Sequence, residues 1–350
     1  MKSLRIITLV ILVWLSGALI ASSQTRSFRQ GSNDDNITSV YFANGGKNVI
    51  ASSLYDDVVM WDVQTGKKVW QFSFEGRRNA KDYFVTKIYQ MVLSPDESRL
   101  ALVRDRFRVV SGTLKEQEWQ IVLVSLKNRD QRQVVYSSKE GLGSVAFSPD
   151  NQLLAWGERD KIHFWNVEAQ ATMPPIELPR CVLSVAFSPD SKFLAAGLTW
   201  ASSCKYDPGT EGLIIFNIRT GERIRASFGT RPIHQLVFSP DSQLLIAAPM
   251  DTPSEVLTWN AESWRRASIL KNVAVPAERL SLSADGSYLA AAFGLFHRAT
   301  VYVWKVRSDH GPQMFRIDQG VWSINMSPGG ETLAVGTEKG RVMLFPTGRG

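Results

Sequence analysis

Histidine and carboxylate side chains that could cooperate chemically are few in this chain of 350 residues, which has only four histidines. His234 and Glu278 occupy equivalent positions in two consecutive repeats of the sequence. In a closed repeat fold such positions come close together, so the pair could act as acid and base or share a metal ion. The alternative is a histidine beside a solvated glutamate, because the equivalent positions of the other repeats vary in type. Those positions hold Thr38, Tyr89, Gly143, Leu183 and Trp322.

Sequence motifs of the common catalytic classes are missing. The sequence contains no Gly-x-Ser-x-Gly elbow, no His-Glu-x-x-His pair and no glycine-rich phosphate loop. We therefore predict no catalytic residue, no metal and no cofactor.

A strand–turn–strand pattern recurs seven times and organises the chain. In its clearest copy, 184–197, alternating apolar residues precede the turn Ser188-Pro189-Asp190-Ser191, and a second apolar run follows. Proline and aspartate at these positions favour a tight turn. The hydrophobic residue before each turn is Phe42, Leu93, Phe147, Phe187, Phe238, Leu282 and Met326. Intervals of 40 to 54 residues, with several short strands in each, predict an all-β, seven-bladed β-propeller.

The pair Trp61-Asp62, in the third predicted strand of the first blade, resembles the signature of the WD40 repeat family. Related pairs, Trp165-Asn166, Phe216-Asn217, Trp259-Asn260 and Trp304-Lys305, occur in other blades, whereas blades two and seven carry Val124-Ser125 and Leu344-Phe345. The resemblance covers the chain after residue 30 and implies four-stranded antiparallel blades.

One departure from the family concerns histidine. WD40 repeats often carry a Gly-His pair before the first strand of a blade, but none of the four histidines here follows a glycine. The chain thus resembles a degenerate, bacterial-style WD40 propeller, and we expect apolar packing and strand ladders to hold its blades. We expect His163 to face outward from its strand.

The last blade has too few residues after 341–345 for a fourth strand. The segment 25–30 stands at the right distance before blade one to supply it, and WD40 propellers commonly close in this way. Closure also removes exposed sheet edges. We predict that this N-terminal strand completes the last blade and that Phe28 packs there.

Propeller topology assigns the loops to two rims. The Ser-Pro-Asp turns lie on one, here called the plain rim. The loops that enter each blade, and those between its second and third strands, lie on the other. This insert-rich rim holds the inserts 106–119, 198–212, 250–255 and 295–300. Insertions on one rim often mark a binding face. The partner-binding residues that we predict on it are Arg180, Trp200, Tyr206, Phe296, His297 and Trp322. Packing of Trp200 and Tyr206 onto their own loop is the alternative.

Residues 1–23 have the layout of a secretory signal peptide. Lys2 and Arg5 precede an apolar run from Ile6 to Ile20, and small residues follow. The alternative is an uncleaved anchor, although the run is shorter than the roughly 20 residues of a typical span. We expect residues 24–350 to form the propeller, exported to the periplasm, the outside of the cell or the outer face of a membrane. Only the first segment would then contact the membrane.

The two cysteines, Cys181 and Cys204, belong to one blade and to one rim. In an exported chain this placement favours a disulfide. Two free thiols are the alternative, because the sequence does not fix the distance between their Cα atoms.

The basic excess of the chain is dispersed. The formal net charge of +7 includes no long run of like charges, and the densest group lies at 104–108. We expect these to be solvated charges and not a nucleic-acid surface, which requires clustering on one face.

These inferences favour a monomeric, exported, non-catalytic scaffold that binds a protein or peptide on its insert-rich rim. A propeller enzyme of the lactonase or quinoprotein type and a carbohydrate or cell-envelope binder are the alternatives. The fold alone does not separate them.

Overall fold

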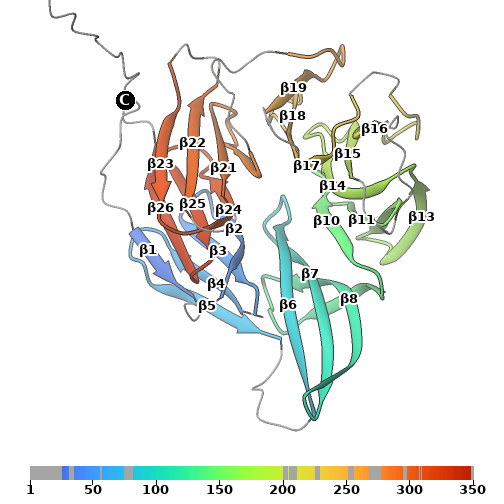
Figure 1. The fold of residues 1–350 in the computed structure, drawn as a ribbon, viewed down its shortest axis with the longest axis vertical. Coiled ribbons are helices and arrows are strands. Elements are labelled where there is room, and N and C mark those ends of the chain that lie inside the picture. The colour runs from blue at the N-terminus through green and yellow to red at the C-terminus, as the bar shows by residue number, and fades with distance from the viewer. Residues whose placement is uncertain are drawn as a thin grey trace, which may run out of the picture.

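The ring predicted from the sequence is present in the computed structural model. The structure describes residues 26–30, 35–55, 57–74, 82–199, 204, 211–224, 229–250, 256–267, 277–294, 298–306, 308 and 310–347. These form seven antiparallel sheets around a central channel, and each sheet is one blade (Figure 1). Among the described residues, no helix has the length and apolar character needed to cross a membrane.

The blades follow one another in chain order. Blade one contains β2 (Ile37–Ala43), β3 (Asn48–Ser53), β4 (Asp57–Asp62) and β5 (Lys68–Ser73). Blade two contains β6 (Asp82–Leu93), β7 (Arg99–Val110), β8 (Thr113–Ser125) and β9 (Arg132–Ser138). Blade three contains β10 (Leu142–Phe147), β11 (Leu153–Glu158), β12 (Lys161–Asn166) and β13 (Ala171–Glu177). Blade four contains β14 (Cys181–Phe187), β15 (Phe193–Thr199) and β16 (Leu213–Asn217).

Blade five contains β17 (Ile233–Phe238), β18 (Leu244–Pro249) and β19 (Leu257–Asn260). Blade six contains β20 (Arg279–Leu282), β21 (Tyr288–Phe293), β22 (Ala299–Lys305) and β23 (Gln313–Ile317). Blade seven contains β24 (Val321–Met326), β25 (Thr332–Thr337), β26 (Arg341–Pro346) and β1 (Arg26–Arg29). In blades four and five, isolated bridges from Phe216 to Arg223 and from Trp259 to Arg266 begin a fourth strand.

The Ser-Pro-Asp turns are bonded internally. In blade four, Ser188 Oγ donates to Asp190 Oδ1 over 2.6 Å and accepts the amide of Phe193 over 2.8 Å. Ser191 has a φ of 55°. Blade three repeats these bonds with Ser148 and Asp150. The turns therefore satisfy their own polar groups, as side chains in tight turns commonly do.

The N-terminal strand closes the ring as predicted. β1 pairs antiparallel with β26, with Phe28 opposite Val342. The Phe28 side chain is buried in a cluster with Trp61, Val342 and Leu344. Gly336 permits a close approach here, because a Cβ atom on it would lie 2.9 Å from the carbonyl oxygen of Ile37. Blades seven and one are thereby in tight contact.

Hydrogen bonds between the innermost strands of neighbouring blades add to the apolar packing expected from the sequence. In six of the seven junctions, a side chain of one blade accepts a backbone amide of the next. The acceptor and donor pairs are Ser39 and Met91, Gln90 and Val145, Ser144 and Val185, Gln235 and Leu280, Ser281 and Met326, and Asn325 and Phe42. Their distances lie between 2.8 and 2.9 Å. Between blades four and five, Ser184 Oγ is buried without a hydrogen-bond partner among the described residues.

Two expectations about charged residues are wrong. His163 does not face outward, since its Nε2 lies 3.0 Å from Glu158 Oε2 and its side chain is only 16% exposed. Tyr136, from the neighbouring blade, donates to the same carboxylate oxygen over 2.7 Å. Arg104 is buried and donates from Nε and Nη2 to Gln120 Oε1. Both side chains are held by partners that lie on other strands.

Candidate functional site

A cavity of about 600 Å³ lies along the axis of the ring. It is lined by the innermost strand of each blade: β2, β6, β10, β14, β17, β20 and β24. Each of these strands begins on the insert-rich rim and runs toward a plain-rim turn. The residues near their starts form what we call the channel mouth: Thr38, Tyr89, Gly143, Leu183, His234, Arg279 and Trp322.

A repeated β-bulge supplies the channel mouth. In β2, β6, β10, β14, β17 and β24 the pairing with the second strand shifts at the mouth residue. A bulge leaves one residue unpaired and re-aims its side chain. At His234, for example, Ile233 pairs with Pro249 and Gln235 pairs with Ala248.

The suggested acid–base pair of His234 and Glu278 is not formed at the mouth. In blade six, Arg279 lines the cavity in place of Glu278. Both residues lie opposite Ala292, since Arg279 is its register partner and the Glu278 amide donates to its carbonyl. The Glu278 carboxylate accepts the amide of Gly294 over 3.0 Å. The residue beside the histidine is therefore a cation.

Arg279 connects three blades at the mouth. Its Nε donates to the carbonyl oxygen of Trp322 over 2.7 Å, and its Nη1 donates to the carbonyl oxygen of Glu278 over 2.8 Å. Nη1 also lies 3.4 Å from each ring nitrogen of His234. Arg279 thus links His234 of blade five to Trp322 of blade seven.

The electrostatics of this group are those of a desolvated cation beside a neutral imidazole. Burial, reinforced by the Arg279 charge, lowers the pKa of His234 to about 4. Burial likewise lowers the pKa of Arg279 to about 10, although Glu278 opposes this change. At neutral pH the guanidinium is charged and the imidazole is not.

The residues predicted to bind a partner have different placements. Trp322 lies at the channel mouth and is half-buried. Arg180 is fully buried, and its Nη1 donates to the carbonyl oxygen of Thr230 over 3.2 Å. Contrary to expectation, Arg180 therefore holds rim loops of blades four and five and presents no surface to a partner. Trp200, Tyr206, Phe296 and His297 lie outside the described residues.

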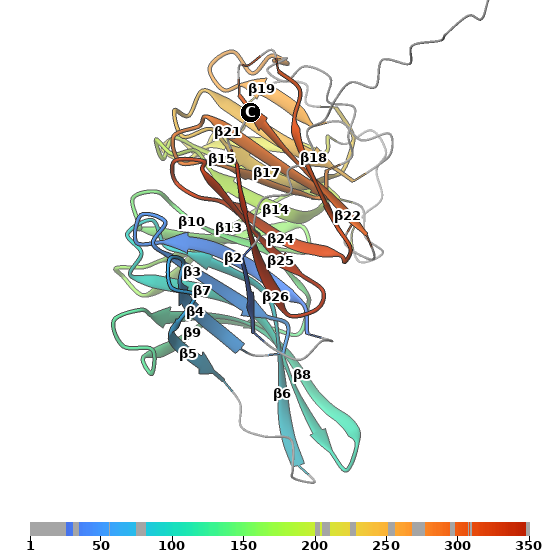
Figure 2. The same cartoon turned by 90° about the vertical axis from the view of Figure 1, so that its left-hand side faces the viewer.

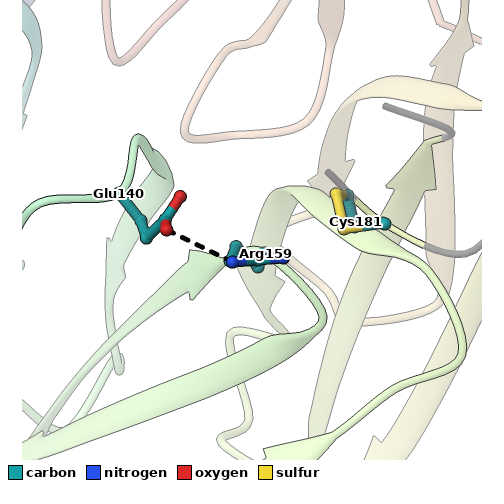
Figure 3. Close-up of a disulfide and its surroundings, with 4 residues drawn as sticks. Glu140, Arg159 and Cys181 are labelled. Atoms are coloured by element: carbon teal, nitrogen blue, oxygen red, sulfur yellow. Dashed lines mark hydrogen bonds and ion pairs between the residues drawn. A yellow bond between two sulfur atoms is a disulfide. The ribbon is translucent and has the colours of Figure 1, made fainter. Parts of the chain in front are cut away.

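The two cysteines form a disulfide on the insert-rich rim, with Cα atoms 5.6 Å apart (Figure 3). The bond ties the start of β14 to the insert that follows β15. Next to it, Arg159 Nη1 lies 3.2 Å from Glu140 Oε1, joining two loops of the same rim. The insert is thus anchored covalently beside the channel.

The insert 106–119 belongs to a β-sheet arm and is not a loop. Residues 82–88, 104–110 and 113–120 of β6, β7 and β8 extend blade two far beyond the ring (Figure 2). We call them the blade-two arm. The Arg106 guanidinium lies 3.5 Å from the Phe84 ring centroid, and Arg108 forms an ion pair with Asp82 at 2.6 Å. Near the arm's tip, Leu114 is 54% exposed.

Comparison with known proteins identifies one repeat of the chain. The model of the WD domain, G-beta repeat, matches residues 177–206, which include β14 and β15 of blade four. Periodic tryptophan protein 2 of Arabidopsis thaliana is 26% identical over 207 residues. That alignment covers 58% of this chain but 22% of the relative. The matched segment supplies two strands of one blade of the seven-bladed ring. This blade of the chain is similar to a WD40 repeat.

One residue of the channel mouth, Arg279, is not predicted from the sequence, although the sequence contains a signal for it. Six repeats carry serine or glutamine at the position of Arg279, namely Ser39, Gln90, Ser144, Ser184, Gln235 and Ser323. A guanidinium in this column of small or neutral polar residues is exceptional. Comparison of the repeats at this position would have singled out Arg279.

To hold a metal ion, the propeller would need several ligand side chains close together. Its described residues include no group of three or more His, Cys, Asp or Glu side chains arranged to hold a metal ion. The chemistry available at the channel mouth is hydrogen bonding, charge pairing and aromatic contact.

Proposed function

We propose that this WD40 propeller is an exported, non-catalytic platform that binds a protein or peptide partner on its insert-rich rim. One observation carries the proposal: the blade-two arm, the disulfide-anchored insert and the channel mouth all open on that rim. WD40 propellers typically act as protein-interaction platforms, which supports the proposal.

The plain rim contrasts with this face. Its turns are short, and their serine and aspartate side chains are used in bonds within the turn. Polar groups that already have internal partners contribute little to recognition, because binding a partner would gain few new hydrogen bonds. Accessible apolar groups occur on the other rim, where Leu114 and Met250 are both more than half exposed.

Export is supported by two features. The first segment has the layout of a secretory signal peptide. The disulfide between Cys181 and Cys204 agrees with an oxidising compartment, where such bonds persist.

Site-specific photo-crosslinking tests the proposal. A photoreactive phenylalanine analogue would replace Leu114 or Met250 on the insert-rich rim, and Gln152 on the plain rim as the matched control. We expect cells that export the protein to yield a discrete crosslinked partner at positions 114 and 250, and none at 152. Crosslinks of equal yield on both rims, or at 152 alone, would overturn the assignment of the binding face.

A further inference from the structure

We propose that the channel mouth binds one carboxylate of an extended peptide segment, and that Arg279 receives it. The inference rests on the proposed function, because it names the chemistry by which a peptide on the insert-rich rim would be recognised.

The charge of the cavity favours an anionic ligand. Arg279 is the one charged side chain among the described residues that line it. Two of its three nitrogens donate to main-chain carbonyls, of Trp322 and of Glu278, and these bonds carry no formal counter-charge. The Glu278 carboxylate offsets only part of the cost of desolvating this cation, since burial still lowers the pKa of Arg279 to about 10. A carboxylate that entered the cavity would supply the missing negative charge.

One nitrogen of the Arg279 guanidinium remains available as a hydrogen-bond donor. Nη2 of Arg279 makes no hydrogen bond to a described residue, and it is not among the buried atoms without a partner. Nη2 therefore retains some exposed surface, on a residue that lines the cavity. The bonds of Nε and Nη1 fix the orientation of the guanidinium plane, so little side-chain freedom remains to be lost on binding. A preorganised guanidinium is a strong donor to a carboxylate oxygen.

The shape and polarity of the surrounding wall suit an extended peptide segment. Gly143 and Leu183, of blades three and four, contribute a small and an apolar surface, whereas Tyr89 and Trp322 contribute aromatic rings. An extended segment could lie on these groups while one acidic side chain points to Arg279. A phosphate dianion fits less well, because the described lining holds one cation and an imidazole that is neutral at pH 7.

His234 provides a reporter for the bound charge. His234 lies on β17 and faces Arg279 of β20 and the main chain of Glu278. The other titratable side chains among the described lining are Tyr41 and Tyr89, and both are neutral near pH 7. No described carboxylate lines the cavity. A ligand carboxylate beside Arg279 would therefore be the nearest negative charge in the cavity, and it would favour the imidazolium form.

The test uses two synthetic peptides, acetyl-Ala-Gly-Glu-Gly-Ala-amide and its glutamine counterpart, with inorganic phosphate as a third probe. The imidazole resonances of the four histidines are followed by NMR in ¹⁵N-labelled protein, and the His234→Gln variant assigns the His234 signal. We expect the glutamate peptide alone to shift the His234 signal and to raise its pKa. His163, which is half-buried in blade three, should stay unchanged and report an intact fold.

Arg279→Gln should weaken binding of the glutamate peptide by about ten- to a hundredfold, the effect of losing a charge-assisted hydrogen bond. Arg279→Lys should retain part of the binding, so a fold defect in the glutamine variant would be recognised. Equal binding of both peptides, equal binding by Arg279→Gln, stronger binding of phosphate, or no binding would each overturn the inference. Crosslinking at Leu114 is independent of this site, so its persistence would leave the proposed function standing.

Discussion

Phe28 of β1 stacks on Trp61 of β4, with ring centroids 5.7 Å apart and ring planes 13° from parallel. The first residue belongs to the outer strand of blade seven and the second to blade one. This contact packs the strand that completes blade seven against blade one, to which the chain then continues through β2. We therefore expect the stacking of Phe28 on Trp61 to stabilise the closed ring.

Replacing Phe28 with alanine should lower the free energy of unfolding by about 3 kcal/mol, because it removes a buried aromatic side chain and its stacking contact with Trp61. Deleting residues 24–31 should lower the melting temperature further. Phe293→Ala is the control, since that ring is 42% exposed. Chemical denaturation measures both variants. Equal losses for the two alanine variants would show that Phe28 has no special role in closure.

The hydrogen bonds between neighbouring blades around the channel predict different effects of two serine substitutions. Ser39→Ala removes the acceptor of the Met91 amide and should cost about 1–3 kcal/mol, the penalty for a buried donor left unpaired. Ser184→Ala should be neutral or slightly stabilising, because its buried hydroxyl makes no hydrogen bond to a described residue. Urea unfolding of both variants tests this. Similar destabilisation by both changes would refute it.

The disulfide should contribute to stability in addition to anchoring the insert. A bridge across a separation of 23 residues is expected to contribute about 3 kcal/mol in the loop-entropy model. The double variant Cys181→Ser/Cys204→Ser should show this loss, and reduction of the wild type should reproduce it. Mass spectrometry of unreduced peptides should recover Cys181 linked to Cys204. Two peptides with free thiols would contradict the pairing.

Acid should destabilise the propeller partly through His234. Burial and Arg279 lower its pKa in the folded state to about 4, compared with the ordinary histidine value of 6.5. Between these values the unfolded chain binds a proton that the folded protein does not, so stability falls as the pH falls from about 6.5 to about 4. The loss is about 3 kcal/mol at most.

His234→Gln should flatten this part of the pH profile. His163, whose pKa burial also lowers, contributes in the same sense and remains in the variant. The difference between the two profiles therefore isolates His234. Parallel profiles of wild type and variant would show that His234 is not buried as a neutral imidazole.

The ring itself could be predicted from the sequence because its signals are local. The serine, proline and aspartate of each turn determine that turn with their own side chains, as in Ser188–Asp190. Closure by the N-terminal strand followed from counting strands, and the pairing of Phe28 with Val342 confirms it.

The channel mouth could not be predicted in the same way. Whether Glu278 or Arg279 faces the cavity depends on a one-residue irregularity opposite Ala292. The alternation of side chains along a strand does not predict such an irregularity. His163 and Arg180 were misplaced for a related reason. Their partners, Glu158 and Thr230, come from another strand and from another blade.

The central claim, that the insert-rich rim is the binding face, is tested most directly by the affinity of a crosslinked partner for two matched double variants. Leu114→Glu/Met250→Glu adds two carboxylates to the insert-rich rim, and Gln64→Glu/Gln152→Glu adds two to the plain rim. We predict that the first pair raises the Kd about tenfold or more, equivalent to about 1.4 kcal/mol, and that the second leaves it unchanged. An unchanged Kd for the first pair and a raised Kd for the second would contradict the account.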